Sequence, residues 1–328
     1  MNSQQTPLVT VIVPNYNYAQ FLDKRLSTVL GQTYRNIKVV LLDDASTDDS
    51  MECMRWWKEQ DSRIVDLVAN ESNSGSPFLQ WKKGFEKANG KYIWIAESDD
   101  YCELTFLETL VPLLEKYENA SICFSGSYQI DENDNYLEHD IDNWTKRQRE
   151  NPDGHKYFDG RMYAERNLFW YNFVYNASGV VFRRSTYEQL TDVECFNMRY
   201  CGDWRFWFNM ALMGGVIEVY KKLNYFRRHS GCVTQSAHMQ GERYVKAMDE
   251  CMNYTLYAGK VLNISSLKLL LSAKVYYRLF KSSGYSEEII KQLNAMQQRL
   301  MPFSYLKYTL LKPLIKVKGY GMGKERCE

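Results

Sequence analysis

The chain has 328 residues, which is enough for one large domain or two modest ones with a substantial core. Its hydrophobic content of 45% and charged content of 25% are ordinary for a soluble globular protein, and a net charge of +1 argues against a nucleic-acid partner. The eight cysteines form no C-x-x-C pair and there are only four histidines, so a zinc site and a small disulfide scaffold are both disfavoured.

The N-terminal residues 1–7 are polar and show no signal-peptide pattern. No apolar run approaches the roughly 18 residues that a transmembrane helix needs. We therefore expect a cytoplasmic protein with free thiols. Aromatic residues make up 15% of the chain, a content that accompanies sugar-facing surfaces but can equally well fill a core.

Strands and helices are expected to alternate along the first third of the chain. Short apolar runs rich in β-branched residues predict strands at 9–14, 37–42, 63–69 and 92–96. Helical spacing of apolar residues predicts the helices that follow them, at 19–30, from Ser46 as N-cap to about 60, at 76–89 and at 103–117. This alternation predicts an α/β protein with a doubly wound, mostly parallel sheet and helices on both faces.

Carboxylates follow two of these strands, at the points where the strands end. Asp43 and Asp44 follow the second strand, and Glu97, Asp99 and Asp100 follow the fourth. Because the carboxyl ends of parallel strands share one edge of a sheet, we expect both groups to line one cleft. Such oxygen ligands suit Mg²⁺ or Mn²⁺. The alternative is a solvated acidic turn that supplies charge to the start of a helix.

Glycine-rich phosphate loops are missing from the expected positions. There is no G-x-G-x-x-G after the first strand and no G-x-x-x-x-G-K-[ST] motif, which disfavours a dinucleotide site and a P-loop. A cleft that binds phosphates without such loops needs a cation, and the carboxylates could hold one.

The pattern becomes less regular after residue 128. A polar stretch at 131–160 is expected to be loop, and strands are expected at 173–182, 216–220 and 223–226. Asp203 follows a glycine at the start of a predicted helix, and the aromatic residues behind it are expected to be core.

The last quarter of the chain is expected to be helical and to carry no chemical motif. Helical spacing occurs at 240–260, 265–281 and 286–300. Residues 301–328 interleave lysines with aromatic and aliphatic residues, and could either lie on an anionic membrane surface or present the lysines to solvent.

Three stretches carry a resemblance to a known family: VIVPNYN at 11–17, LDDASTD at 42–48 and IAESDD at 95–100. In this order and spacing they resemble glycosyltransferase family 2. The resemblance covers about residues 8–235 and implies a GT-A fold and an inverting, usually metal-dependent transferase. It implies a transferase domain at 1–235, with a donor half at about 8–128 and an acceptor half at about 129–235, followed by a helical C-terminal region at 236–328.

The resemblance also implies roles for residues of the donor half. Pro14 and Tyr16 would line the nucleotide pocket, and Asp44, with Asp43 beside it, would bind the base. Asp99 and Asp100 correspond to the ribose and metal carboxylates, with Asp100 as the main ligand of Mg²⁺ or Mn²⁺.

Two positions depart from the family pattern. Most relatives have Asp where Glu97 stands, and Glu97 keeps the charge on a longer side chain as a further candidate metal ligand. Trp81 and Lys82 occupy the place of a frequent Arg-Asn pair. Lys82 could still approach phosphate, and Trp81 could replace the base contact.

The acceptor half supplies the remaining expected site residues. By resemblance Asp203 is the general base that takes the proton of the acceptor hydroxyl, although a helix cap is the alternative. His229, with Arg228 beside it, would lie against the diphosphate, unless it belongs to a surface loop. Asn176 and Trp204 are expected on the acceptor side.

The sequence thus predicts an enzyme that transfers a sugar from a nucleotide-diphosphate donor, with a UDP-sugar favoured, to a hydroxyl of a glycan or lipid-linked glycan acceptor. By analogy with the family, the pathway would be bacterial surface polysaccharide synthesis. A nucleotidyltransferase and a non-catalytic protein that binds nucleotide sugars or glycans are the alternatives. The site of action would be the cytoplasm, with the C-terminal segment as a candidate contact with the inner face of the membrane.

Overall fold

A computed structural model describes residues 6–138, 151–229 and 242–265, together with residues 269, 287, 288, 291, 292 and 295. The contacts divide the chain into two compact units. The first comprises Met1–Met162 and Val174–His229, and the second comprises Tyr163–Phe173 and Ser230–Glu328. The boundary expected near residue 235 stays a prediction, and the contacts also assign the short segment Tyr163–Phe173 to the second unit.

One mixed sheet forms the centre of the first unit, with the strand order β3-β2-β1-β4-β8-β6-β9-β5 and with β7 paired to β9. Strands β3, β2, β1 and β4 are parallel neighbours, as the alternation of elements predicts. Strand β8 runs antiparallel to both β4 and β6, while β6 and β9 are parallel. The strands are β1 Val9–Asn15, β2 Ile37–Asp43, β3 Ile64–Ala69, β4 Tyr92–Ile95, β5 Tyr101–Cys102, β6 Ala120–Ile130, β7 His155–Phe158, β8 Val180–Arg183 and β9 Gly215–Arg227.

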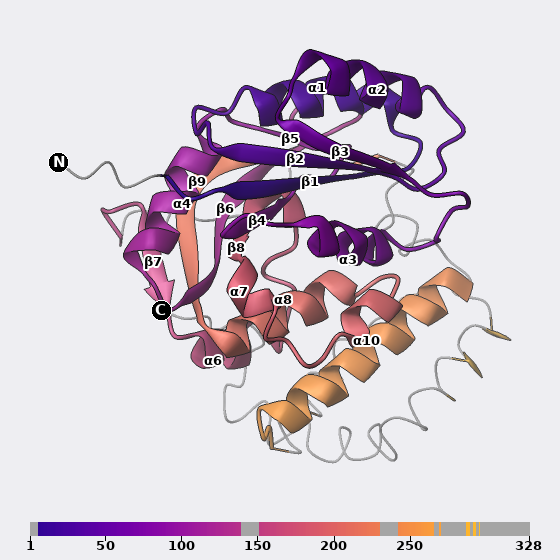
Figure 1. Cartoon of the computed structure of the whole chain (residues 1–328). Helices are drawn as coiled ribbons and strands as arrows, with labels where there is room; N and C mark the ends of the chain where they lie inside the picture. Colours follow the sequence, from indigo (N-terminus) through magenta and orange to yellow (C-terminus); the bar gives the residue numbers. More distant parts are fainter. Residues whose placement is uncertain are drawn as a thin grey trace. The chain divides into compact units, whose positions relative to one another are not determined.

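Helices cover both faces of this sheet (Figure 1). The α-helices that begin in the first unit are α1 Ala19–Leu30, α2 Ser50–Gln60, α3 Pro77–Lys87, α4 Phe106–Lys116, α6 Gly160–Tyr163, α7 Arg184–Tyr187 and α8 Gly202–Met213, and the second unit contains α10 Glu242–Val261. A π-helical turn, η1, spans Ala164–Leu168, and short 3₁₀ turns occur at η2 Ala177–Gly179 and η3 Glu194–Asn197.

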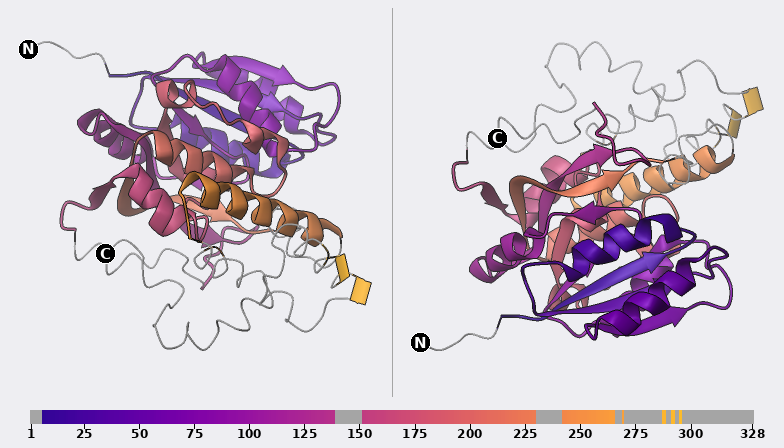
Figure 2. Two further views of the ribbon diagram at one scale, coloured as in Figure 1. Left: turned by 90° about the horizontal axis from the view of Figure 1, so that it is seen from below. Right: turned by 90° about the horizontal axis from the view of Figure 1, so that it is seen from above.

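Strand β1 shows why the layers form. Its apolar residues are buried on both faces of the sheet, as expected of a central parallel strand. Val11 and Val13 belong to the core shared with α1, α2 and α4, whereas Ile12 faces Gly84 of α3. Viewed from above, α1 and α2 lie side by side over the parallel strands (Figure 2, right). On the other face, Phe85 of α3 packs against Phe182 of β8.

Several local predictions are corrected by the structure. The strand expected at 173–182 is limited to Val180–Arg183 and is preceded by the turn η2. The two strands expected at 216–220 and 223–226 are one continuous strand, β9. The stretch 131–160, expected to be loop, contains β7 and the start of α6. The α/β architecture itself is confirmed.

The second unit contains η1 and α10, and α10 lies where a helix is expected at 240–260. Tyr254 of α10 donates a hydrogen bond from its hydroxyl to the carbonyl oxygen of Leu168, at 2.7 Å. The helices expected at 265–281 and 286–300 lie outside the described residues apart from a few single positions, and the segment 301–328 lies entirely outside them. Within the described part of the chain, no helix is both long and apolar enough to cross a membrane.

Gly84 marks the closest approach of α3 to the sheet. A Cβ atom there would lie 2.4 Å from Cγ2 of the fully buried Ile12. Alanine favours a helix over glycine by about 1 kcal/mol, but overpacking a core costs about 1–3 kcal/mol, and so close an approach should cost the upper part of that range. We therefore expect Gly84→Ala to lower the free energy of unfolding by about 1–2 kcal/mol in urea denaturation.

Glu86→Ala, at an exposed position of the same helix, is the control and should change the free energy of unfolding by less than about 0.5 kcal/mol. Equal stability of Gly84→Ala and the wild type would contradict the tight packing of α3 on β1.

Candidate active site

The carboxyl ends of β1, β2 and β4 bring the predicted donor residues to one edge of the sheet. Asn15 at the end of β1 is aligned with Asp43 at the end of β2, and β4 runs parallel on the other side of β1. The loop after β4 is tied to β1, because the Ser98 hydroxyl donates a hydrogen bond to the carbonyl oxygen of Pro14 at 2.7 Å. The expected convergence of the two acidic groups on one edge is thus present.

Asp43 is buried and organises the tips of β1 and β2. Its carboxylate accepts hydrogen bonds from the Asn15 side-chain amide at 3.0 Å, and from the backbone N–H and hydroxyl of Ser46 at 2.9 and 2.6 Å. The sequence suggested Ser46 as the N-cap of α2, and this prediction is wrong. The helix begins at Ser50, whose N–H is accepted by Asp48 at 3.1 Å.

Asp44 is also buried, and protein donors surround its carboxylate. Oδ1 accepts hydrogen bonds from Asn70 Nδ2 at 2.5 Å, Ser74 N at 2.9 Å and Gln80 Nε2 at 2.8 Å. Oδ2 accepts one, from the Ser74 hydroxyl at 2.7 Å. Asp44 thus orders the segment between β3 and α3. Tyr16, by contrast, has an exposed ring just beyond β1.

Glu97 and Trp81 form a pair that the sequence did not predict. The indole N–H of Trp81 donates to Glu97 Oε1 at 2.7 Å, and the Trp81 ring is buried against Phe78 and Trp207. Burial and the neighbouring Asp99 raise the pKa of Glu97 to about 8. Trp81 is therefore a partner of Glu97 and part of the core. Lys82, the next residue of α3, is exposed.

Asp100 is buried, and both of its carboxylate oxygens have partners. Oδ1 accepts the backbone N–H of Arg227 at 2.9 Å, and Oδ2 accepts the Asn176 side-chain amide at 3.0 Å. Burial and the neighbouring Asp99 raise the pKa of Asp100 to about 7. Asn176, predicted on the acceptor side, thus lies directly against the principal predicted metal carboxylate.

Asp99 is only partly buried and faces His229. Its Oδ2 atom lies 3.0 Å from Nε2 of His229, and the His229 ring packs against the rings of Tyr18 and Phe21. His229 is therefore held at the site and does not belong to a free surface loop. Arg228 is half-buried, with its guanidinium over the ring of Phe226.

These residues fit a divalent cation only in part. The described residues contain no group of three or more His, Cys, Asp or Glu side chains that could hold a metal ion alone. However, Mg²⁺ in nucleotide sites is usually held by one or two carboxylates together with phosphate oxygens and water. Asp99, Asp100 and the adjacent His229 can supply the protein's share. Burial is the larger cause of the raised pKa of Asp100, and the charge of Asp99 adds to it; a cation would offset the second of these effects.

Asp203 lies in the first turn of α8, and Cys201 occupies the N-cap position. The start of this helix packs tightly, because a Cβ atom on Gly202 would lie 2.5 Å from the Phe78 ring of α3. Trp204 is half-buried, while Phe206, Trp207 and Phe208 are core residues, as expected. The geometry thus fixes α8 against α3 and leaves the role of Asp203 to be tested.

Sequence reasoning missed two buried arginines. Arg227 donates from Nε to the carbonyl oxygen of Asp99 at 2.7 Å, in addition to its backbone bond to Asp100. Arg25 lies over the Trp94 ring, and its side-chain nitrogens have no hydrogen-bond partner within the described part of the chain. Its charge lowers the pKa values of Glu97 and Asp100, against the larger raising effects of burial and Asp99. A charged residue on the apolar face of α1 was the available signal for Arg25.

Comparison with known proteins assigns the family. Residues 10–191 match the model of glycosyl transferase family 2, which is more than half of the chain. An uncharacterized glycosyltransferase of Haemophilus influenzae is 28% identical over 96% of this chain and 92% of that protein. Glycosyltransferase GlyG of Streptococcus pneumoniae is 35% identical, but the match spans 39% of this chain and only 41% of GlyG. The chain belongs to glycosyl transferase family 2.

Solved structures confirm the fold. S. aureus TarS 1-349 in complex with UDP-GlcNAc has a TM-score of 0.62 at 15% identity, covering 94% of this chain and 86% of that one. The mannosyltransferase PcManGT of Pyrobaculum calidifontis, in complex with GDP-Man and Mn²⁺, has a TM-score of 0.54 at 16% identity, covering 97% and 89%. The first unit thus has the GT-A fold expected from the sequence.

The hydrogen bonds to Asp44 generate a stability prediction. In Asp44→Asn, the side-chain N–H₂ group would face some of the N–H and O–H groups that now donate hydrogen bonds to the carboxylate. We expect the free energy of unfolding without nucleotide to fall by about 2–3 kcal/mol, because buried donors lose a charged acceptor. Glu71→Gln, at an exposed position of the same segment, is the control. Unchanged urea midpoints for Asp44→Asn would contradict a structural part for this carboxylate.

Proposed function

We propose that this protein is an inverting glycosyltransferase. It moves a sugar from a nucleotide-diphosphate donor, with a UDP-sugar favoured, to a hydroxyl of a glycan or lipid-linked glycan. The observation that carries the proposal is the meeting of Asp99, Asp100 and His229 at the carboxyl edge of the sheet, in a chain of family 2. The complexes of TarS with UDP-GlcNAc and of PcManGT with GDP-Man name donors of this class for those two proteins.

The nucleotide would bind along the ends of β1 and β2. The exposed ring of Tyr16 offers a face on which a base can stack. Within the described residues, Asp44 Oδ2 accepts one hydrogen bond, from the Ser74 hydroxyl, so it retains a lone pair for an N–H of the base. Pro14 closes the pocket from β1, Asp43 holds the neighbouring loop, and Asp99 would accept hydrogen bonds from the ribose.

The diphosphate would lie between the β4 loop and the end of β9. A bound Mg²⁺ or Mn²⁺ supplies charge that neutralises the leaving diphosphate. Asp100 and Asp99 would hold that ion, Arg228 would add positive charge beside the phosphates, and His229 would lie against the diphosphate. Glu97 has a lesser part, because Trp81 already occupies one of its oxygens.

Asp203 would act as the general base. An inverting displacement needs a base on the side of the sugar opposite the leaving diphosphate, where it takes the proton of the attacking hydroxyl. A carboxylate in the first turn of a helix is favoured in its ionised form by the helix dipole. Asn176 and Trp204 would position the acceptor. Among the alternatives, family membership favours sugar transfer over nucleotidyl transfer.

A donor screen tests the proposal directly. We expect nucleotide release from one of the UDP-, GDP- or dTDP-sugars when a glycan acceptor is supplied, and thermal protection by the matching nucleoside diphosphate. A protein that no nucleoside diphosphate protects would lack the donor site.

Metal removal is expected to abolish donor binding. With EDTA, thermal protection by the nucleoside diphosphate should disappear, and excess Mn²⁺ or Mg²⁺ should restore it, because the carboxylates would otherwise repel the phosphates. Ca²⁺, which prefers more ligands and longer bonds, is the comparison ion. Full protection in EDTA would overturn the metal part of the proposal.

Asp203→Asn is expected to lower kcat by at least about a hundredfold, since general-base catalysis contributes about 10²–10⁴-fold. Nucleotide binding, measured by calorimetry, should stay within about twofold of the wild type, because the substitution lies outside the proposed donor site. Glu188→Gln, a half-exposed acid that pairs with Arg184, is the matched control. Full activity of Asp203→Asn would refute the base assignment.

A further inference from the structure

Arg227, the last residue of β9, holds both acids of the proposed metal site. Its backbone N–H donates to Asp100 Oδ1 at 2.9 Å, and its Nε donates to the carbonyl oxygen of Asp99 at 2.7 Å. The side chain is only 2% exposed, and its guanidinium lies 4.4 Å from the centre of the Phe21 ring. One buried residue thus fixes the acid loop after β4 from two directions.

The far end of the same guanidinium is held by the turn that follows β6. Nη1 donates to the carbonyl oxygen of Asp131 at 2.8 Å, and Nη2 donates to Asp134 Oδ1 at 2.6 Å. The Asp131 carboxylate closes the turn by accepting the backbone N–H groups of Asn133 and Asn135 at 2.8 and 2.9 Å. The turn therefore presents Asp134 in a defined position.

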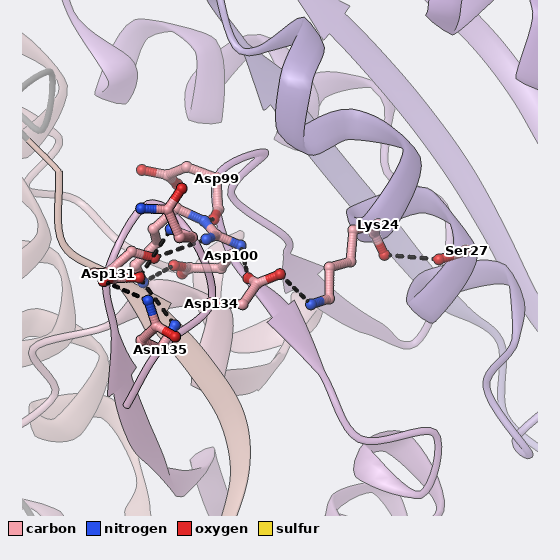
Figure 3. Close-up of polar contacts among 9 residues, drawn as sticks. Lys24, Ser27, Asp99, Asp100, Asp131, Asp134 and Asn135 are labelled. Carbon is pink, nitrogen blue, oxygen red and sulfur yellow. Dashed lines mark hydrogen bonds and ion pairs between the residues drawn. The ribbon is translucent and has the colours of Figure 1, made fainter. Parts of the chain in front are cut away.

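Asp134 lies between two basic side chains (Figure 3). Its second oxygen, Oδ2, accepts a hydrogen bond from Lys24 Nζ of α1 at 2.6 Å. Lys24 is also 3.8 Å from the centre of the Tyr101 ring, next in sequence to Asp100. Asp134 thus has two ion pairs, the Lys24 arm and the Arg227 arm. They differ in burial, because the Lys24 and Asp134 side chains are 42% and 39% exposed whereas the Arg227 side chain is enclosed. Exposed ion pairs contribute little, so the Arg227 arm should carry most of the effect.

We propose that Asp134 is a positioning residue for the metal carboxylates and acts through Arg227. Asp99 and Asp100 repel each other when both are ionised, so an unbraced loop would separate them and would have to be reordered when a cation binds. With Asp134 in place, the guanidinium cannot turn away from the Asp99 carbonyl, and β9 keeps its N–H on Asp100. The inference rests on the proposed function, because it assigns the brace to the same metal site.

The backbone at Asp134 allows a clean test. Its φ angle is +68°, a left-handed conformation in which glycine is unstrained. Asp134→Gly should therefore keep the turn and remove only the carboxylate. Asp134→Asn keeps an acceptor oxygen for Arg227 but loses the charge, and asparagine also tolerates this conformation. Lys24→Met removes the exposed ion pair with Asp134, together with the contact of Lys24 with the Tyr101 ring, and leaves Arg227 paired with Asp134. It is the matched control.

The measurement is Mn²⁺ binding in the presence of UDP or GDP, followed by the electron paramagnetic resonance signal of free Mn²⁺, with nucleotide release measured over the same Mn²⁺ range. For Asp134→Gly we expect the half-saturating Mn²⁺ concentration to rise more than twofold and up to about tenfold, the ratio that corresponds to the net contribution of one ordinary hydrogen bond. Asp134→Asn should lie between Asp134→Gly and the wild type. For both Asp134 variants, the kcat at saturating Mn²⁺ should stay within about twofold of the wild type. For Lys24→Met, the half-saturating Mn²⁺ concentration should also stay within about twofold of the wild type.

The outcomes separate this inference from the proposed function. Absence of nucleotide-dependent Mn²⁺ binding by the wild type removes the metal site and both proposals with it. Binding by the wild type, with Asp134→Gly unchanged within a factor of about two, overturns the brace alone. A shift in Lys24→Met as large as that in Asp134→Gly would also overturn it, because the exposed arm would then carry the effect. If Asp134→Gly lowers the melting temperature, Arg227→Lys is the second variant. It keeps the charge but loses the guanidinium hydrogen bonds, and it must raise the half-saturating Mn²⁺ concentration by the same factor.

Discussion

The repulsion among three carboxylates at one partly buried edge of the sheet is the constraint on which the site depends. Glu97, Asp99 and Asp100 follow β4 within four residues, where burial and the neighbouring Asp99 raise the pKa values of Glu97 and Asp100 to about 8 and about 7. Such crowding is unfavourable unless donors or cations compensate it. Trp81 of α3, Asn176 before η2 and Arg227 at the end of β9 donate hydrogen bonds to this loop, and so offset part of its negative charge.

Two buried arginines compensate this charge in different ways. Arg227 donates several directed hydrogen bonds and so fixes the geometry of the acid loop. Arg25 makes none within the described residues, and acts on the acids through its charge from its position over the Trp94 ring. Both arginines thus offset the negative charge of the acid loop, Arg227 through directed bonds and Arg25 through its charge alone.

The antiparallel strand β8 connects the segment expected to face the acceptor with the acid loop after β4. It places η2 beside the end of β4, where the carbonyl oxygen of Ser178 accepts the indole N–H of Trp94 at 2.8 Å. The Ser178 hydroxyl accepts the backbone N–H of Glu97 at 3.1 Å, and Asn176 reaches Asp100. Residues from the segment expected to face the acceptor thus hold the loop expected to bind the donor. A substitution in one of these segments should therefore alter the geometry of the other.

The sequence by itself determined the α/β class, the parallel strands β1 to β4 and the convergence of Asp43 and Asp44 with Glu97, Asp99 and Asp100. Apolar runs identify buried strands locally, and the geometry of parallel strands then places their ends at one edge. Only the tertiary structure decided which side chains the acids meet. Trp81 reaches Glu97 across 16 positions, and Arg227 reaches Asp100 across 127. The sequence also did not predict that β8 runs antiparallel, or that Ser46 binds Asp43 instead of capping a helix. No local pattern encodes such contacts, because they form only when elements distant in sequence pack together.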